Sequence, residues 1–455
     1  MSTDLNSRPL VSEDQIAQMM HRLERSQSLV GLIGLGYVGL PLMLAFCSSG
    51  FRTLGFDIDP DKVAVLNRGE SYLKHIGDQN IAFVRGSKQF EATHDFDRLA
   101  EVDVAIVCVP TPLGAHREPD LSFVVGTTRE IAKRLRPGQM VILESTTFPG
   151  TTREVMKPIL ESTGLRSGTD FFLAYSPERE DPGNAEFGTA SIPKVVAGDG
   201  ETASRLALAL YRRVVVNTIP VSSLDTAEAV KITENVFRAV NIALVNELKI
   251  IFNEMDIDVF EVIEAAKSKP FGFMPFYPGP GLGGHCIPVD PFYLTWRARE
   301  YGIATRFIEL AGEVNTSMPQ YVVERLRMEL DRRFRKGLYG TRIVIIGIAY
   351  KKDVDDLRES PALAIVDLLI AAGAVVDYHD PYFPTILPTR KHMSLAGKAS
   401  VSFDPESLGS YDAALIATDH SAIDYEMLVR CVPLVVDTRN TIASDSPFAH
   451  VVARA

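Results

Sequence analysis

The stretch LVGLIGLGYVGLPLMLAF, residues 29–46, decides how the first part of the chain folds. It opens with an apolar run typical of a buried parallel strand, passes through Gly34-x-Gly36-x-x-Gly39, and continues as an apolar helix. In such a loop the first glycine permits a tight turn, the second lets the backbone approach a pyrophosphate, and the third lets the helix pack on the strand. The stretch predicts a dinucleotide-binding unit, with a glycine-rich packing turn as the alternative.

The residues around this loop favour NAD. The start of the helix offers free backbone N–H groups to a phosphate, and we expect Tyr37 and Val38 to contribute there. The next predicted strand, 52–59, contains Asp57, about 20 residues beyond the loop, where a carboxylate accepts both ribose hydroxyls of NAD and repels the 2′-phosphate of NADP. Asp59, two residues later, is the competing candidate.

Apolar runs alternate with helical patterns beyond this unit, which is typical of a doubly wound α/β domain; we place it at residues 28–218. Thr111 and Thr146 follow two of the strands and are expected to border the same crevice, although threonine after a strand is also ordinary turn chemistry. The runs read as buried parallel strands are 29–34, 52–59, 102–110, 139–146, 171–177 and 193–198.

The pattern changes after this domain. Residues 224–255 contain no Gly or Pro and have apolar residues at helical spacing, which predicts one long helix in a helical middle domain at 219–334. A second α/β domain is expected at 335–455. Its predicted strands are 341–350, 374–381, 411–420 and 433–440.

Residues 1–27 are interpreted as an N-terminal extension with one amphipathic helix at 14–25. They lack the pattern of a signal peptide, and the chain has no run of about 18 apolar residues, so we expect no membrane span.

The composition is that of an ordinary globular protein. The 455 residues are 46% hydrophobic and 23% charged, with a net charge of −11, which argues against nucleic acid or an anionic membrane as the main partner. The cysteines are far apart and form neither a disulfide framework nor a metal site, so a reduced, cytoplasmic protein without a metal is expected. They are Cys47, Cys108, Cys286 and Cys431.

Cys286 differs from the other cysteines, which we interpret as structural. It lies in a loop of small residues that allow close approach, and Asp290 follows it. A reactive thiol also needs positive charge nearby. The long helix could supply it, because Lys231 and Asn235, four residues apart, share one face and Arg238 lies on the same side; a solvated polar stripe is the alternative. His285 is a poor partner because adjacent side chains usually point apart.

At these residues the sequence resembles the nucleotide-sugar 6-dehydrogenases of the UDP-glucose/GDP-mannose dehydrogenase family. The resemblance runs in family order from about residue 30 to 440 and is most similar to the UDP-N-acetylglucosamine 6-dehydrogenase branch. Arg179 stands where UDP-glucose dehydrogenases have a different pattern. The matching motifs are GLGYVGLPL, VPTP, ESTTFPGTT, YSPERE, KITENVFRAVNIALVNE, GPGLGGHCIPVDP, GIAYKKDVDDLRES and VDTRN.

The resemblance implies two Rossmann-like domains, for NAD and for a UDP-sugar, joined by a long central helix and a helical middle domain. It also implies a homodimer or higher homo-oligomer with the long helix at the interface, and an active site in the cleft between the two α/β domains.

The resemblance further implies a chemistry. Oxidising a CH₂OH group to a carboxylate removes four electrons, so two NAD act in turn. Cys286 is the expected nucleophile, forming a thiohemiacetal and then a thioester; Lys231 and Asn235 are expected to stabilise the oxyanions. Asp290, with Thr146, is expected to hold a water, and Glu178 to assist thioester hydrolysis.

Residues for the ligands are carried over in the same way. Arg358 is expected to contact the nicotinamide cofactor, and the loop 276–284 to wrap the uridine and sugar. The expected substrate-binding residues are Glu178, Arg179, Lys231, Asn235, Tyr277, Gly283, Lys351 and Arg439.

The leading hypothesis is oxidation of UDP-N-acetylglucosamine to its uronic acid, a precursor of bacterial surface polysaccharides. The alternatives are the same chemistry on UDP-N-acetylgalactosamine, UDP-N-acetylmannosamine or UDP-glucose, a one-hydride β-hydroxyacid dehydrogenase, and a non-enzymatic NAD-binding protein. The second α/β pattern argues against the one-hydride enzyme.

Overall fold

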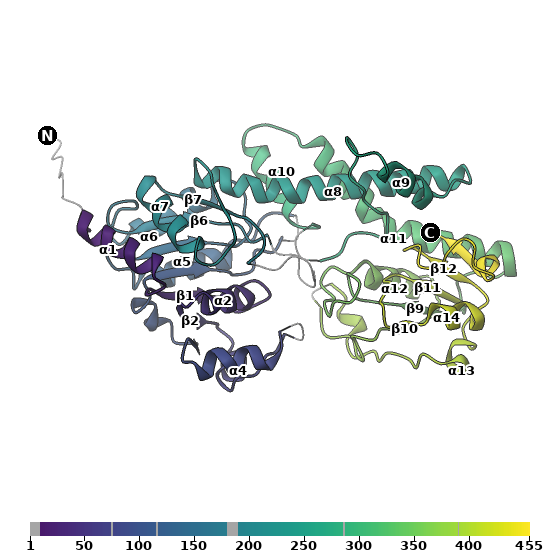
Figure 1. Ribbon diagram of the computed structural model, residues 1–455. Coiled ribbons are helices and arrows are strands. Elements are labelled where there is room, and N and C mark those ends of the chain that lie inside the picture. The colour runs from purple at the N-terminus through teal and green to yellow at the C-terminus, as the bar shows by residue number, and fades with distance from the viewer. Residues whose placement is uncertain (1–9, 74–75, 115–116, 180–189, 285–286, 390) are drawn as a thin grey trace. The chain divides into compact units, whose positions relative to one another are not determined.

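The computed structural model describes residues 10–73, 76–114, 117–179, 190–284, 287–389 and 391–455 (Figure 1). The chain forms two compact units, and the division falls inside the long helix, after Glu234. The first unit comprises residues 1–234 and 292–303, and the second comprises residues 235–291 and 304–455.

The first unit is built on an eight-stranded sheet with the order β3-β2-β1-β4-β5-β6-β7-β8. Strands β2, β1, β4, β5 and β6 pair in parallel, as predicted. The glycine loop follows β1 and therefore lies at the carboxyl edge, beside the end of β4. The strands are β1 (Leu29–Ile33), β2 (Arg52–Phe56), β3 (Phe90–Thr93), β4 (Val104–Val107), β5 (Met140–Leu143), β6 (Phe172–Tyr175), β7 (Lys194–Gly198) and β8 (Thr218–Pro220).

One strand direction was predicted wrongly. β7 pairs with β6 in the antiparallel sense, with Ala174 opposite Gly198. Its five residues are all buried, so its apolar run indicates a central strand but carries no information on direction. The short strands β3 and β8 were not predicted at all.

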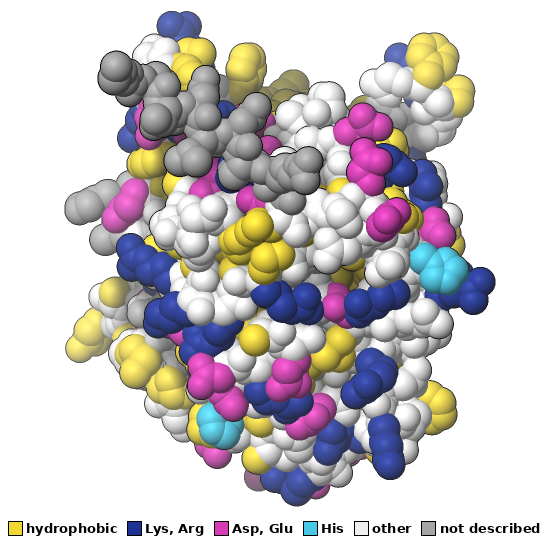
Figure 2. All heavy atoms as spheres, turned by 90° about the vertical axis from the view of Figure 1, so that its left-hand side faces the viewer, with side chains coloured by type: hydrophobic (Ala, Val, Ile, Leu, Met, Phe, Trp, Pro, Cys, Tyr) yellow, Lys and Arg dark blue, Asp and Glu magenta, His cyan; other side chains and the backbone are white. Residues whose placement is uncertain are grey.

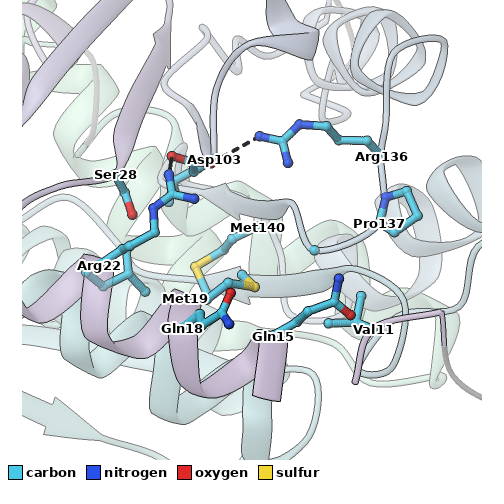
Figure 3. Close-up of a pocket in the computed structure, with 13 residues that line it drawn as sticks. Val11, Gln15, Gln18, Met19, Arg22, Ser28, Asp103, Arg136, Pro137 and Met140 are labelled. Atoms are coloured by element: carbon cyan, nitrogen blue, oxygen red, sulfur yellow. Dashed lines mark hydrogen bonds and ion pairs between the residues drawn. The ribbon is translucent and has the colours of Figure 1, made fainter. Parts of the chain in front are cut away.

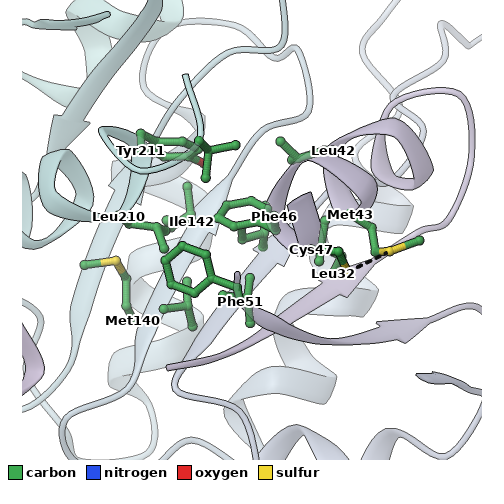
Figure 4. Close-up of a cluster of buried hydrophobic side chains, with 14 of the residues drawn as sticks. Leu32, Leu42, Met43, Phe46, Cys47, Phe51, Met140, Ile142, Leu210 and Tyr211 are labelled. Atoms are coloured by element: carbon green, nitrogen blue, oxygen red, sulfur yellow. Dashed lines mark hydrogen bonds between the residues drawn. The ribbon is translucent and has the colours of Figure 1, made fainter. Parts of the chain in front are cut away.

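Alternate strand residues face two apolar layers, as a sheet covered on both sides requires. Figure 4 shows the layer in which Phe46 of α2 and Tyr211 of α7 pack over the sheet, with Cys47 among them. The opposite layer is covered by α5 and α6. The helices of this unit are α1 (Glu13–Glu24), α2 (Gly39–Ser48), α3 (Pro60–Asn67), α4 (Asp78–Gly86), α5 (Ser122–Ala132), α6 (Lys157–Glu161) and α7 (Glu201–Tyr211).

Helix α1 belongs to the core of this unit and is more than an extension. Leu23 is 2% exposed, and the partly buried Ile16, Met19 and Met20 pack against the same apolar layer, on the predicted face. Arg22 forms an ion pair with Asp103 at the amino end of β4. A cavity of about 190 Å³ remains between α1 and this edge of the sheet (Figure 3).

The second unit contains a five-stranded parallel sheet with the order β10-β9-β11-β12-β13. Four of these strands were predicted, whereas the three-residue β13 was missed. The strands are β9 (Arg342–Ile346), β10 (Val375–His379), β11 (Ala413–Ile416), β12 (Val435–Asp437) and β13 (Val452–Arg454); the helices on this sheet are α12 (Pro361–Ala371), α13 (Pro405–Leu408) and α14 (Tyr425–Cys431).

The predicted long helix is α8 (Leu224–Glu254), and α9 (Val259–Lys267) follows it within the predicted helical middle domain. The helical segment predicted up to Phe334 is two helices, α10 (Asp290–Glu300) and α11 (Arg306–Phe334). Residues 292–303 pack on the first unit, where the Trp296 ring lies 5.0 Å from that of Phe148.

Charges of both signs lie interspersed over the face shown in Figure 2. Within the described parts of the chain, none of the helices combines enough length and apolar character to cross a membrane.

Candidate active site

The glycine loop after β1 has the geometry predicted for binding a dinucleotide. Gly34 has a φ of +91°, which favours glycine, and its N–H donates to Phe56 O at 2.8 Å. A Cβ at Gly39 would lie 1.9 Å from Gly34 O, so this glycine permits the helix to approach the strand. A Cβ at Gly36 would meet nothing within 4 Å, so space is open at the one position assigned to the pyrophosphate. Tyr37 and Val38 lead into α2, where the side chain of Val38 makes no capping hydrogen bond.

Asp57 lies directly after β2 and is 7% exposed. Its Oδ2 accepts the N–H of Leu35 at 3.0 Å, so the carboxylate is held against the glycine loop. The competing candidate, Asp59, caps α3 by accepting the N–H groups of Asp61 and Lys62. The two acids therefore have different structural roles, and the position of Asp57 fits the ribose of NAD.

The two predicted threonines connect the neighbouring strand ends. Thr111 is 4% exposed, and its hydroxyl donates to Thr146 O at 2.8 Å. Tyr293 of α10 donates to Thr111 O, which ties α10 to the same place. Thr147 was not among the predicted site residues. It is fully buried, and its Oγ1 has no hydrogen-bond partner among the described residues.

Glu178 belongs to a buried charge cluster that was not predicted. Lys194 Nζ lies 2.6 Å from Glu144 Oε2 and 3.3 Å from Glu178 Oε2, and Tyr211 donates to Glu144. Burial raises the pKa of Glu144 to about 7, although Lys194 opposes this shift. Burial alone would lower the pKa of Lys194, but the two carboxylates outweigh it and hold that pKa above its usual value. Lys194 therefore fixes one oxygen of Glu178.

Arg179 is held by two contacts within the first unit. Its guanidinium pairs with Glu234 of α8 at 2.6 Å and donates to Pro193 O at 2.6 Å. Its backbone N–H donates to the other oxygen of Glu178 at 2.6 Å. Both oxygens of Glu178 thus have hydrogen-bond donors from this chain.

Lys231 and Asn235 on α8 are 8% and 1% exposed, so a solvated polar stripe does not describe them. No described residue forms a hydrogen bond or ion pair with the Lys231 ammonium. Asn235 Nδ2 donates to Asp290 Oδ2 at 2.6 Å, and Asp290 is 2% exposed. His285 and Cys286 lie outside the described residues.

The remaining cysteines fit their structural interpretation. Cys47 is 1% exposed and contacts Thr53 at 3.2 Å, and burial raises the pKa of its thiol to about 11. Burial also raises the pKa of Cys108 well above its usual value. Neither thiol is therefore activated as a nucleophile.

Two arginines of the second unit have different environments. Arg358 forms a two-bond pair with Asp356, with an Nη2–Oδ2 distance of 2.6 Å, and its side chain is 44% exposed. Arg439 follows β12, and its Nε donates to Ala417 O at 2.9 Å. Burial lowers the pKa of Arg439 despite the nearby carboxylates of Asp419 and Asp437. Lys351 is half-buried after β9.

The loop at 276–284 packs against side chains of the second unit at its glycines. A Cβ at Gly279 would lie 2.7 Å from Arg439 Nη1, and a Cβ at Gly283 would lie 2.6 Å from Tyr350 Cβ. The loop backbone therefore lies directly against Arg439. Tyr277 is 43% exposed, and its hydroxyl donates to Glu264.

The residues present fit NAD, because the space at Gly36, the N-terminus of α2 and the carboxylate of Asp57 follow one another along the carboxyl edge of β1 and β2. Among the described residues, no group of three or more His, Cys, Asp or Glu side chains could hold a metal ion.

Comparison with known proteins gives matches along most of the chain. At the sequence level, a UDP-N-acetyl-D-glucosamine 6-dehydrogenase of Pseudomonas aeruginosa is 39% identical over 395 residues, which cover 86% of this chain and 90% of that protein. A UDP-N-acetyl-D-mannosamine dehydrogenase of Pyrococcus horikoshii is 34% identical, with coverage of 91% and 96%. A solved structure of a UDP-D-ManNAc dehydrogenase from Pyrococcus horikoshii superimposes with a TM-score of 0.84 at 32% identity, covering 94% of this chain and 98% of that one.

Three family models also match, in order along the chain. They describe the NAD-binding domain, the central domain and the UDP-binding domain of one family, at residues 28–215, 225–317 and 344–444. Together with the open glycine loop and the two sheets, the first mostly parallel and the second wholly parallel, these matches show that the chain belongs to the UDP-glucose/GDP-mannose dehydrogenase family and is an NAD-dependent oxidoreductase.

Proposed function

We propose that the protein oxidises UDP-N-acetylglucosamine at C6 to the corresponding uronic acid, in two steps that remove four electrons. The observation that carries the proposed substrate is the 39% identity to a UDP-N-acetyl-D-glucosamine 6-dehydrogenase over most of both chains. The product would serve as a precursor of surface polysaccharide.

The proposed chemistry needs a group that retains the half-oxidised sugar. NAD supplies a hydride acceptor when bound. Cys286, in the motif GGHC, attacks the aldehyde carbon, and the resulting thiohemiacetal keeps the sugar attached until the second oxidation yields a thioester. Water then releases the carboxylate and regenerates the thiol.

Each of these steps passes through an oxygen that carries negative charge. Lys231 is assigned to stabilise that charge, because the residue is only 8% exposed and its ammonium has no counter-ion among the described residues. Asn235 is assigned the second donor, and its bond to Asp290 fixes the orientation of the amide. Asp290, with Thr146, is assigned to hold the water that moves the proton.

Glu178 is assigned as the general base for thioester hydrolysis. Its carboxylate is held by Lys194 and by the N–H of Arg179, which fixes its orientation. Lys351, Arg439, Tyr277 and Gly283 are assigned to the UDP-sugar, Arg179 to the sugar end, and Arg358 to the cofactor.

The test measures NADH and product together. Purified protein is incubated with NAD and a panel of UDP-sugars, and two NADH should form per sugar consumed, with UDP-N-acetylglucosamine the best substrate by kcat/KM. The Cys286→Ser variant should make no uronate. Release of free aldehyde as the main product, or uronate formation by that variant at the wild-type rate, would contradict the proposal.

UDP-N-acetylmannosamine is the second candidate substrate. It is favoured by the UDP-N-acetyl-D-mannosamine dehydrogenases of 29–34% identity and by the structural superposition. The two sugars differ at a single stereocentre. The same sugar panel separates the two candidates, because kcat/KM is measured for each sugar by itself.

A further inference from the structure

A second lysine of α8, Lys249, is buried without a counter-ion. It is 4% exposed, and its Nζ has no hydrogen-bond partner among the described residues. Burial lowers the pKa of Lys249 to about 7, and the positive charges of Arg439 and Arg325 lower it further, opposed only by Asp437. A buried ammonium without a partner is destabilising, so its presence calls for an explanation outside the stability of the free protein.

Two of the three charged groups that act on Lys249 are cations, Arg325 and Arg439. Arg325 on α11 has an Nε with no hydrogen-bond partner in the described chain, and its Nη2 lies 3.9 Å from Glu329. The hydroxyl of Tyr321, one turn before Arg325 on α11, is also buried and has no hydrogen-bond partner in the described chain. The cluster of Lys249, Arg325 and Arg439 therefore presents unused donors to a ligand with acceptor oxygens.

Two acids face this cluster. Asp419 acts on Arg439, and its Oδ2 lies 3.7 Å from Lys352 Nζ. Asp437 is engaged by closer contacts. Its Oδ2 pairs with Arg454 at 2.5 Å and accepts the N–H of Ile442 at 3.0 Å. Its Oδ1 accepts the N–H of Arg439 at 2.9 Å. These bonds orient the carboxylate toward the backbone after β12, so it offsets the cationic charge only at a distance.

The cluster adjoins the loop that we assign to the UDP-sugar. Asn246, one turn before Lys249 on α8, accepts the N–H of Gly279 at 3.0 Å. Gly279 in turn lies against Arg439, where a Cβ would be 2.7 Å from Nη1. The loop backbone, the guanidinium of Arg439 and this face of α8 thus meet in one place within the second unit.

We propose that the ammonium of Lys249, together with Arg439, binds the diphosphate of the nucleotide sugar; this inference rests on the proposed function. A diphosphate carries two negative charges and several acceptor oxygens, which matches two cations that form no ion pair with any carboxylate of the described residues. In the free protein at pH 8 the lysine is mostly neutral, so binding the anion there requires uptake of a proton. At pH 6 the lysine is already charged, and no proton is taken up by it.

The test measures binding of UDP by isothermal titration calorimetry in buffers of different ionisation enthalpy. The Lys249→Met variant keeps the length of the side chain and removes its charge. It should bind UDP about tenfold or more weakly at pH 6.5, with a smaller ratio at pH 8.5, and should lose the proton uptake seen with the wild type at pH 8. The matched control is Lys336→Met, an exposed lysine paired with Asp412 at 2.6 Å, which should leave UDP binding unchanged.

A stability measurement separates binding from folding. Because Lys249→Met removes a buried unpaired charge, its melting temperature at pH 6.5 should equal or exceed that of the wild type. Lys249→Arg retains the charge and should recover part of the UDP affinity. UDP affinity and proton uptake in Lys249→Met that equal the wild-type values would overturn the inference, as would wild-type protein that takes up no proton at pH 8.

The outcome for Lys249 is distinguishable from that for the proposed function. If the wild type produces two NADH per UDP-sugar while Lys249→Met binds UDP normally, only the role of Lys249 fails. If no UDP-sugar is oxidised by the wild type, the proposed function fails whatever the variant does.

Discussion

Gly36 and Gly39 lie three residues apart in one loop but lack a side chain for different reasons. Gly39 is required by the protein itself, since a Cβ there would lie 1.9 Å from Gly34 O. Gly36 has open space around it, so its requirement comes from the ligand. We expect Gly36→Ala to melt within a few degrees of the wild type but to bind NAD at least about tenfold more weakly.

Gly39→Ala is the matched comparison and should lower both the melting temperature and the affinity for NAD, because the loop must move to admit the methyl group. Thermal melting and titration of NAD by protein fluorescence measure the two effects. Equal loss of stability in both variants would show that Gly36 is also a packing residue.

Lys194 carries the buried charge cluster beside Glu178. Replacing it with Met leaves the carboxylate of Glu144, which is fully buried, without its cation, and should cost about 3–5 kcal/mol of unfolding free energy. The raised pKa of Glu144, about 7 in the folded protein, means that the folded state holds its proton at a pH where the unfolded state has lost it. At pH 5 the buried carboxyl of Glu144 is protonated and needs no cation, whereas at pH 8 it is charged. The loss of unfolding free energy caused by Lys194→Met should therefore be greater at pH 8 than at pH 5.

Urea unfolding at the two pH values measures this effect. The double variant Lys194→Met, Glu144→Gln removes both charges and should recover a large part of the lost free energy. Additive losses in the double variant would mean that the two residues do not interact.

At the scale of elements, α1 shows how a segment outside the family match becomes part of the core. The family match for the NAD-binding domain begins at residue 28, yet Leu23 is 2% exposed in the apolar layer above the sheet. Leu23→Ala should lower the free energy of unfolding by about 2–5 kcal/mol, as for other buried leucines. The neighbouring exposed Glu24→Ala should change it by less than about 0.5 kcal/mol.

Chemical denaturation of the full chain measures both variants. A Leu23→Ala variant as stable as Glu24→Ala would mean that α1 contributes nothing to the core and serves only as an extension.

At the scale of the whole molecule, α8 exposes an apolar stripe that one chain alone leaves in contact with water. Phe237, Leu244 and Ile251 recur every seven residues and are 49%, 52% and 44% exposed. Leu244 also borders a groove of about 580 Å³ between α8, α9 and the loop that follows them. In keeping with the oligomer that the resemblance implies, we propose that a second copy of the chain covers this stripe, because three large apolar side chains at seven-residue spacing would otherwise face water.

Leu244→Asp should shift the protein toward the monomer in light scattering coupled to size exclusion, because burying a carboxylate there opposes association. Leu244→Met preserves the apolar contact and should keep the wild-type mass. A wild-type protein that runs as a monomer at high concentration would contradict the proposed interface.

Local patterns along the chain were enough to predict several features of this protein. The glycine loop, the long α8 and most strands were predicted, because spacing along the chain sets backbone conformation and burial in a strand or helix. The short strands β3, β8 and β13 were missed because three or four residues carry too little pattern. The antiparallel direction of β7 was predicted wrongly because an apolar run reads the same in both directions.

Which charged residues from distant parts of the sequence come into contact depends on the folded chain. Glu144 and Lys194 are 50 residues apart, and Lys249 lies on a different element from Arg325 and from Arg439. Apart from Arg439, which the resemblance assigns to the substrate, each is an ordinary charged residue in the sequence and would be expected at the surface. The folded chain removes them from water, and their free energy then depends on which partner lies within a few ångströms, a quantity that no local pattern records.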